Sequence, residues 1–206
     1  MRKIKIMVLC SLLCVLLFAQ SAFAIGESTL TFWFSDSDKI AYWDSTVYIY
    51  CTIAGGFYFN DIYAYARQKW SNAGMPTSFT NSSSNANILV FAGTETLIEA
   101  LSGIDIGPYE TGLTVGASTH MYYATYGSYS KSVRKQLAQQ KILIPHRNRT
   151  ENEYKKTTMH ELGHALGWMG HSSNEADIMW SGASSLTSLS NRDIKQIIQL
   201  YTDEEE

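Results

Sequence analysis

Two histidines and a glutamate in the last quarter of the chain have the spacing that zinc hydrolysis requires. His160 and His164 are four residues apart in a stretch predicted to be helical, so their imidazoles share one helix face. Imidazoles placed in this way can occupy two corners of a zinc tetrahedron, at zinc-to-nitrogen distances of about 2.0–2.1 Å. Glu161 follows the first histidine directly, where its carboxylate can hold and deprotonate a water bound to the metal. The segment therefore predicts a hydrolytic site with one catalytic Zn²⁺ ion.

A third ligand is needed, because a catalytic zinc uses three protein ligands and leaves a fourth position for water. His171 follows seven residues after His164, beyond Gly167, a residue type that can turn the chain at the end of a helix. The residues themselves leave three possibilities open. His171 reaches the metal, or Glu175 or Asp177 takes its place, or the site is damaged.

The segment resembles the zinc-binding motif of the metzincin metalloproteases, and within them the matrixin-like branch. That motif reads His-Glu, two residues, His, two residues, Gly, two residues and His, followed later by a Met-turn. The residues that match it in place are His160, Glu161, His164 and Gly167. Three residues rather than two separate Gly167 from His171, so we expect the turn to bulge by one residue.

The residues after the motif extend the resemblance. Met179, in the run 177–180, is similar to the methionine of the matrixin Met-turn, and it follows His171 by eight residues, at a similar interval. This register favours His171 as the third metal ligand. Ser181 stands where some metzincins have a tyrosine, which makes the chain more similar to matrixins than to astacins or serralysins. The resemblance implies peptide-bond hydrolysis with polypeptide substrates.

Alternating strand-like and helix-like patterns predict an α+β fold. The strands are expected at 47–51, 88–91, 113–118 and 141–144, with one helix over about 60–73. Two further helices are expected to begin at capping boxes, in which a hydroxyl residue is followed three positions later by an acidic residue. These boxes are Thr150 with Glu153, before the motif, and Ser190 with Asp193, near the end of the chain.

The resemblance makes the expected fold more specific. It implies a metzincin-like zincin, with a mixed twisted sheet, an active-site helix and a closing C-terminal helix. It also implies that residues 112–117 form an edge strand over the cleft, where an extended substrate could add its backbone to the sheet.

The N-terminus has the layout of a secretory signal peptide. A cationic start is followed by an apolar run over residues 6–18 and by small residues at Ala22 and Ala24, so cleavage is expected after Ala24. The 13-residue run is too short to span roughly 30 Å of hydrocarbon comfortably. We therefore expect a secreted protein with no membrane partner after cleavage.

The remaining chain is expected to be one metalloprotease catalytic domain over residues 25–201, followed by an acidic tail over 202–206. Its upper part would extend to about residue 167 and a small lower part would begin at about 168. We expect this domain to be a monomer.

Composition excludes several other classes. The 206 residues are 45% hydrophobic and 17% charged, which is typical of a globular chain with one packed core. Removal of residues 1–24 would leave 13 basic and 19 acidic residues, a net charge of −6, so nucleic acid is not an expected partner. It would also leave Cys51 as the only thiol, which excludes an internal disulfide and indicates a buried strand residue.

The expected function is that of a secreted zinc endopeptidase. In the expected mechanism Glu161 takes a proton from the attacking water and passes it to the leaving amine. Two alternatives remain at this level. One is a zinc hydrolase of cell-wall peptides or other amides, and the other is an inactive secreted binding module that retains the fold.

Overall fold

The computed structural model describes residues 39–43, 45–55, 58–75, 77–126, 129–168 and 170–201. The predicted signal peptide, the first residues of the predicted catalytic domain and the acidic tail lie outside the described residues. None of the helices in these ranges has the length and apolar character needed to cross a membrane.

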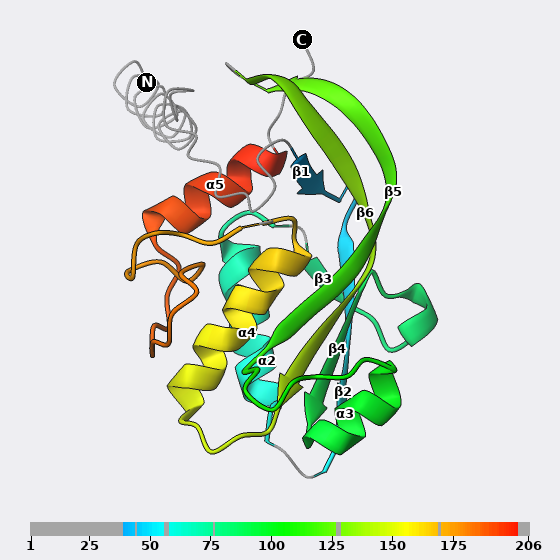
Figure 1. Ribbon diagram of the computed structural model, residues 1–206, viewed down its shortest axis with the longest axis vertical. Coiled ribbons are helices and arrows are strands. Elements are labelled where there is room, and N and C mark those ends of the chain that lie inside the picture. The colour runs from blue at the N-terminus through cyan, green and yellow to red at the C-terminus, as the bar shows by residue number, and fades with distance from the viewer. Residues whose placement is uncertain are drawn as a thin grey trace, which may run out of the picture. The chain divides into compact units, whose positions relative to one another are not determined.

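The described chain contains a six-stranded sheet. Its strands are β1 (Lys39–Tyr42), β2 (Val47–Ile53), β3 (Thr77–Phe79), β4 (Ile88–Gly93), β5 (Leu113–Tyr126) and β6 (Tyr129–Pro145). Four parallel pairings give the order β1-β6-β4-β2-β3, and β5 pairs antiparallel with β6, so the sheet is mixed (Figure 1).

The position of β5 follows from the register. β1 pairs with residues 133–136 of β6 and β4 pairs with residues 140–145, while β5 pairs with β6 along both stretches. A strand has two hydrogen-bonding sides, so β1 and β4 must share one side of β6 and β5 must occupy the other. No other strand in the described ranges pairs with β5, so within them β5 is an edge strand along its whole length.

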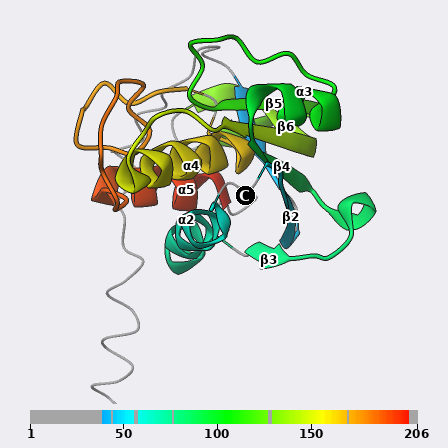
Figure 2. The same cartoon turned by 90° about the horizontal axis from the view of Figure 1, so that it is seen from below.

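In the part of the chain that the structure describes, four α-helices accompany the sheet: α2 (Asn60–Asn72), α3 (Glu95–Ser102), α4 (Glu151–Ala165) and α5 (Asn191–Tyr201), with a 3₁₀ turn, η2 (Ser83–Asn85). α2 packs against α4 on one side of the sheet, whereas α3 packs on β4 and β6 from the other side (Figure 2). β4 is consequently buried on both faces. Leu89, Phe91 and Leu143 form a core with Ile98 of α3.

The expected α+β class is confirmed, with the expected strands and helices in place. The helix predicted over 60–73 is α2, and both capping boxes are present: Thr150 with Glu153 at α4, and Ser190 with Asp193 at α5.

Several details differ from the expectations. β1 and β3 were not among the predicted strands. β5 and β6 are much longer than the short runs at 113–118 and 141–144, since their pairing continues into a polar stretch without an apolar pattern. α3 was not predicted, because it is only eight residues long. Cys51 lies on β2 as expected, but it is half-buried rather than fully buried.

Candidate metal centre

α4 carries the first two histidines, and its start is fixed locally. The hydroxyl of Thr150 accepts a hydrogen bond from the backbone N–H of Glu153 at 3.3 Å, and the Glu153 carboxylate accepts one from the Thr150 N–H at 2.7 Å. From residue 156 to 163 every side chain of the helix is buried. Trp70 of α2 donates its indole N–H to the carbonyl of Met159 at 2.8 Å, one residue before the first histidine. The capping box, the burial of residues 156–163 and the hydrogen bond from Trp70 therefore hold the helix that carries the histidines in place.

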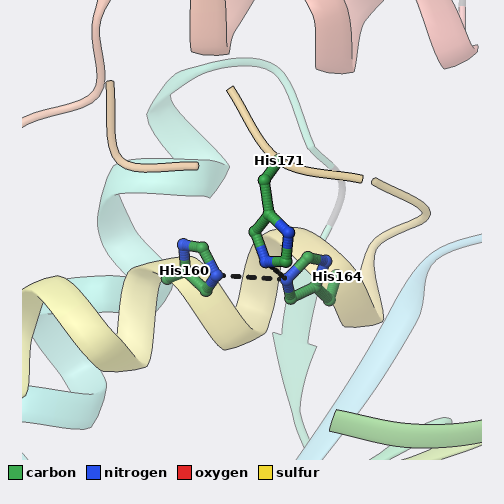
Figure 3. A group of neighbouring side chains, drawn as sticks. All are labelled: His160, His164 and His171. Carbon is green, nitrogen blue, oxygen red and sulfur yellow. Dashed lines mark hydrogen bonds between the residues drawn. The ribbon is translucent and has the colours of Figure 1, made fainter. Parts of the chain in front are cut away.

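Three imidazoles converge at one point. The Nε2 atom of His164 lies 3.1 Å from that of His160 and 3.3 Å from that of His171 (Figure 3). The first two rings come from successive turns of α4, and the third comes from the segment after Gly167, whose φ of 119° lies in a region that favours glycine. Among the residues that the structure describes, this is the one group of three or more side chains that could hold a metal ion.

The alternative third ligands are not part of this group. Glu175 is exposed, and both carboxylate oxygens of Asp177 are within hydrogen-bonding distance of the Arg192 guanidinium. Of the three candidates, the structure brings only His171 to the pair on α4. The extra residue between Gly167 and His171 therefore does not keep His171 away from the pair.

The tautomers of the two helical histidines follow from their second hydrogen bonds. Nδ1 of His160 lies 2.8 Å from the carbonyl oxygen of Ile178, and Nδ1 of His164 lies 2.7 Å from that of Trp168. A carbonyl oxygen can only accept, so each Nδ1 carries the proton and each Nε2 presents a lone pair. Two lone pairs 3.1 Å apart repel each other, and a shared cation removes that repulsion.

The spacing also fits zinc. Zinc-to-nitrogen distances of about 2.0–2.1 Å in a tetrahedron place neighbouring nitrogens roughly 3.3 Å apart, and the two measured separations are 3.1 and 3.3 Å. Burial lowers the pKa of His160 to about 2 and that of His164 to about 4, and it also lowers the pKa of His171. All three rings are therefore neutral at pH 7, which is the form that binds a metal.

The loop after His171 forms the floor beneath the helix. Met179 is fully buried, and a Cβ added to Gly163 would lie only 2.4 Å from its sulfur. The buried carboxylate of Asp193 accepts hydrogen bonds from the backbone N–H groups of Ile178 and Met179, at 2.9 and 3.3 Å. Because Ile178 also supplies the carbonyl that orients His160, α5 supports the histidine through this loop.

Glu161 follows His160 directly on α4 and is buried. The residue is only 7% exposed. Burial raises the pKa of the Glu161 carboxyl to about 7, although a hydrogen bond from Thr114 acts in the opposite direction. The Thr114 hydroxyl, on β5, lies 2.7 Å from the Glu161 Oε2 atom. One turn earlier, the Lys156 ammonium donates to the carbonyls of Trp180 and Gly182 at 2.7 and 3.2 Å.

Sequence reasoning missed Thr114 and Lys156 because their contacts join distant parts of the chain. The only local signal for Thr114 was a hydroxyl residue at the start of an apolar strand.

Comparison with known proteins adds one decisive observation: the sequence model described as matrixin matches residues 59–202, which include α4, the three histidines and α5. This chain belongs to the matrixin family. As a matrixin it is a zinc metalloprotease, and the expected family is confirmed.

Other comparisons are weaker. Two solved structures of myroilysin are similar to this chain, with TM-scores of 0.40 and 0.41. The first is 17% identical, over 80% of this chain and 81% of the myroilysin chain, and the second is 14% identical, over 86% and 95%. No curated protein sequence matches the chain. The family assignment therefore depends on the family model.

Proposed function

We propose that this matrixin is a secreted zinc endopeptidase whose metal is held by His160, His164 and His171 and whose general base is Glu161. The convergence of three Nε2 atoms, with the buried Glu161 next to the first of these histidines on α4, is the observation that carries the proposal. When bound, zinc supplies a Lewis acid that polarises the scissile carbonyl and lowers the pKa of water.

The role of Glu161 follows from its place next to the first ligand on α4. A carboxylate there can accept a proton from the water that attacks the carbonyl carbon, and it can then donate that proton to the nitrogen of the leaving amine. One group thus moves the proton in both halves of the reaction. His160 and His164 contribute by keeping their Nε2 lone pairs unprotonated, since their Nδ1 atoms donate to carbonyls.

The edge strand β5 favours a peptide as the substrate. Its outer side has no partner strand in the described part of the sheet, so its backbone can pair with an extended chain. The strand begins beside Glu161, because Gly112 and Thr114 both contact that side chain. A polypeptide added to β5 would therefore run alongside the general base.

The two alternatives have different support. A hydrolase of cell-wall peptides would use the same metal and base, so only substrate tests separate it from an endopeptidase. The inactive binding module was motivated by the altered spacing of His171, and that motive is weakened because the ring lies 3.3 Å from His164.

The first test is Glu161→Ala. We expect the variant to bind zinc as the wild type does and to lose about 10²–10⁴-fold in turnover on peptide libraries, the usual contribution of a general base. Peptide cleavage at the wild-type rate would refute the role of Glu161. Cell-wall fragments, assayed in parallel, identify the alternative hydrolase if they are cleaved and peptides are not.

The second test concerns the third ligand. His171→Ala should release zinc to a mild chelator faster than the wild type, because one of three protein ligands is lost. His146→Ala is the matched control, since His146 is exposed at the end of β6 and belongs to no ligand group in the described chain. Equal zinc retention in both variants would remove His171 from the ligand set.

A further inference from the structure

The side chain of Glu161 is held by the beginning of β5. The Thr114 hydroxyl lies 2.7 Å from the Glu161 Oε2 atom and 3.0 Å from its backbone carbonyl oxygen. A threonine hydroxyl has one proton, and hydrogen bonds to a charged acceptor are the stronger ones, so the carboxylate is the preferred acceptor.

Gly112 makes the close approach possible. Residues 112 and 114 point to the same side of the chain, because side chains alternate along an extended segment. A Cβ added at Gly112 would lie 2.8 Å from Cγ of Glu161 and 2.6 Å from Cγ2 of Thr157, both well inside contact distance. A glycine at 112 therefore leaves room for the carboxylate, and the residue two positions later supplies a donor.

The two carboxylate oxygens consequently have different surroundings. Oε2 accepts from Thr114, whereas Oε1 lies next to Gly112, where an added Cβ would come within 2.9 Å of it, and no hydrogen bond to Oε1 is found among the described residues. A carboxylate held through one oxygen keeps a fixed orientation and leaves the other oxygen available to a proton donor. The β-branched Thr114 side chain has few χ1 rotamers, which adds to this fixed orientation.

We propose that Thr114 is a positioning residue for the general base: its hydroxyl holds Oε2 of Glu161 so that Oε1 takes and returns the proton. The proposal rests on the proposed role of Glu161. It also connects substrate binding with catalysis, because the strand that would pair with the peptide is the strand that orients the base.

Thr114→Val tests the proposal, because valine keeps the shape of threonine without the hydroxyl. We expect kcat for a peptide substrate to fall about 10- to 100-fold, as for the loss of a hydrogen bond to a charged group. KM and zinc content should stay at wild-type values, since the β5 backbone and the histidines are unchanged. Thr114→Ser, which retains the hydroxyl, should recover most of kcat.

Thr77→Val on β3 is the matched control. It makes the same substitution on another strand, where the buried Thr77 hydroxyl has no hydrogen-bond partner in the described chain. Its kcat should equal that of the wild type. If Thr114→Val does not fold, Thr114→Ser and Thr114→Ala can be compared instead. The first keeps a hydroxyl at position 114 and the second lacks one, so their kcat values make the same comparison.

A second readout separates positioning from simple stabilisation. In a Glu161→Gln background, loss of the Thr114 hydroxyl should change the residual kcat by less than twofold. The effects of substitutions at residues that act as one unit are not additive.

The possible results point in different directions. Three results would overturn the role of Thr114 while leaving Glu161 as the base. They are a kcat of Thr114→Val within twofold of the wild type, an equal loss of kcat in Thr114→Ser, and an effect of Thr114→Val on KM alone. A wild-type protein that is loaded with zinc and cleaves no peptide would instead overturn the proposed function, and the role of Thr114 with it.

Discussion

Gly163→Ala should destabilise this protein, although alanine is the better helix former. Gly163 lies in α4 between the two histidines, and its Cα faces the Met179 side chain. An added Cβ would stand 2.4 Å from Met179 Sδ and 3.1 Å from Cζ2 of Trp70. Ordinary contacts between such atoms are about 3.5–4.0 Å, so the methyl group overlaps the sulfur by more than about 1 Å.

The net effect can be estimated from two opposing contributions. Replacement of glycine within a helix gains about 1 kcal/mol. Overpacking of a filled core costs about 1–3 kcal/mol, and the upper half of that range applies because Met179 and Trp70 are both fully buried. We therefore expect a net loss of about 1–2 kcal/mol, equivalent to a fall in Tm of roughly 2–8 °C for a domain of this size.

Urea unfolding of a double-mutant cycle with Met179→Ala measures this overlap directly. All four proteins are compared at the same excess of zinc, because bound metal shifts the apparent stability. Without the Met179 side chain only the 3.1 Å approach to Cζ2 of Trp70 remains, so Gly163→Ala should destabilise less in that background than in the wild type. A stabilising effect in the wild-type background, or the same effect in both backgrounds, would refute the packing of Gly163 on the Met-turn.

Two further predictions concern other parts of the fold. Thr150→Ala removes the capping box of the metal-binding helix and should lower the free energy of unfolding by about 1 kcal/mol, measured by urea unfolding. The same substitution at a threonine that caps no helix should leave the free energy of unfolding unchanged. Burial raises the pKa of the Cys51 thiol to about 12, so between about pH 9 and pH 12 the unfolded chain loses a proton that the folded chain keeps. Stability should therefore fall as pH rises through this range, and Cys51→Ala should show a shallower fall; identical slopes would contradict the burial of the thiol.

The parts of the site that are local in sequence could be predicted from sequence. Helical geometry places residues i and i+4 on one face, so His160 and His164 needed only the prediction of a helix, and the capping box at Thr150 supplied its start. The contribution of His171 required two further arguments, the tetrahedral ligand count and the register of Met179. Both depend on short spacings along the chain.

The contacts that join distant segments could not be predicted. Thr114 precedes Glu161 by 47 residues, and its role depends on the pairing of β5 with β6. Beyond residue 118 the sequence has no periodic pattern that predicts this pairing. Asp193 was predicted as a helix cap, but its carboxylate also binds the backbone N–H groups at the Met-turn, 14 and 15 residues earlier. Such contacts depend on how the elements pack, and single-sequence patterns carry little of that information.

X-ray absorption at the zinc edge of the loaded protein tests the metal centre most directly, because it counts imidazole ligands and measures their distances. The account predicts three imidazole nitrogens at about 2.0–2.1 Å in the wild type and two in His171→Ala. Two imidazoles in the wild type, with a carboxylate oxygen in place of the third, would contradict a site formed by His160, His164 and His171.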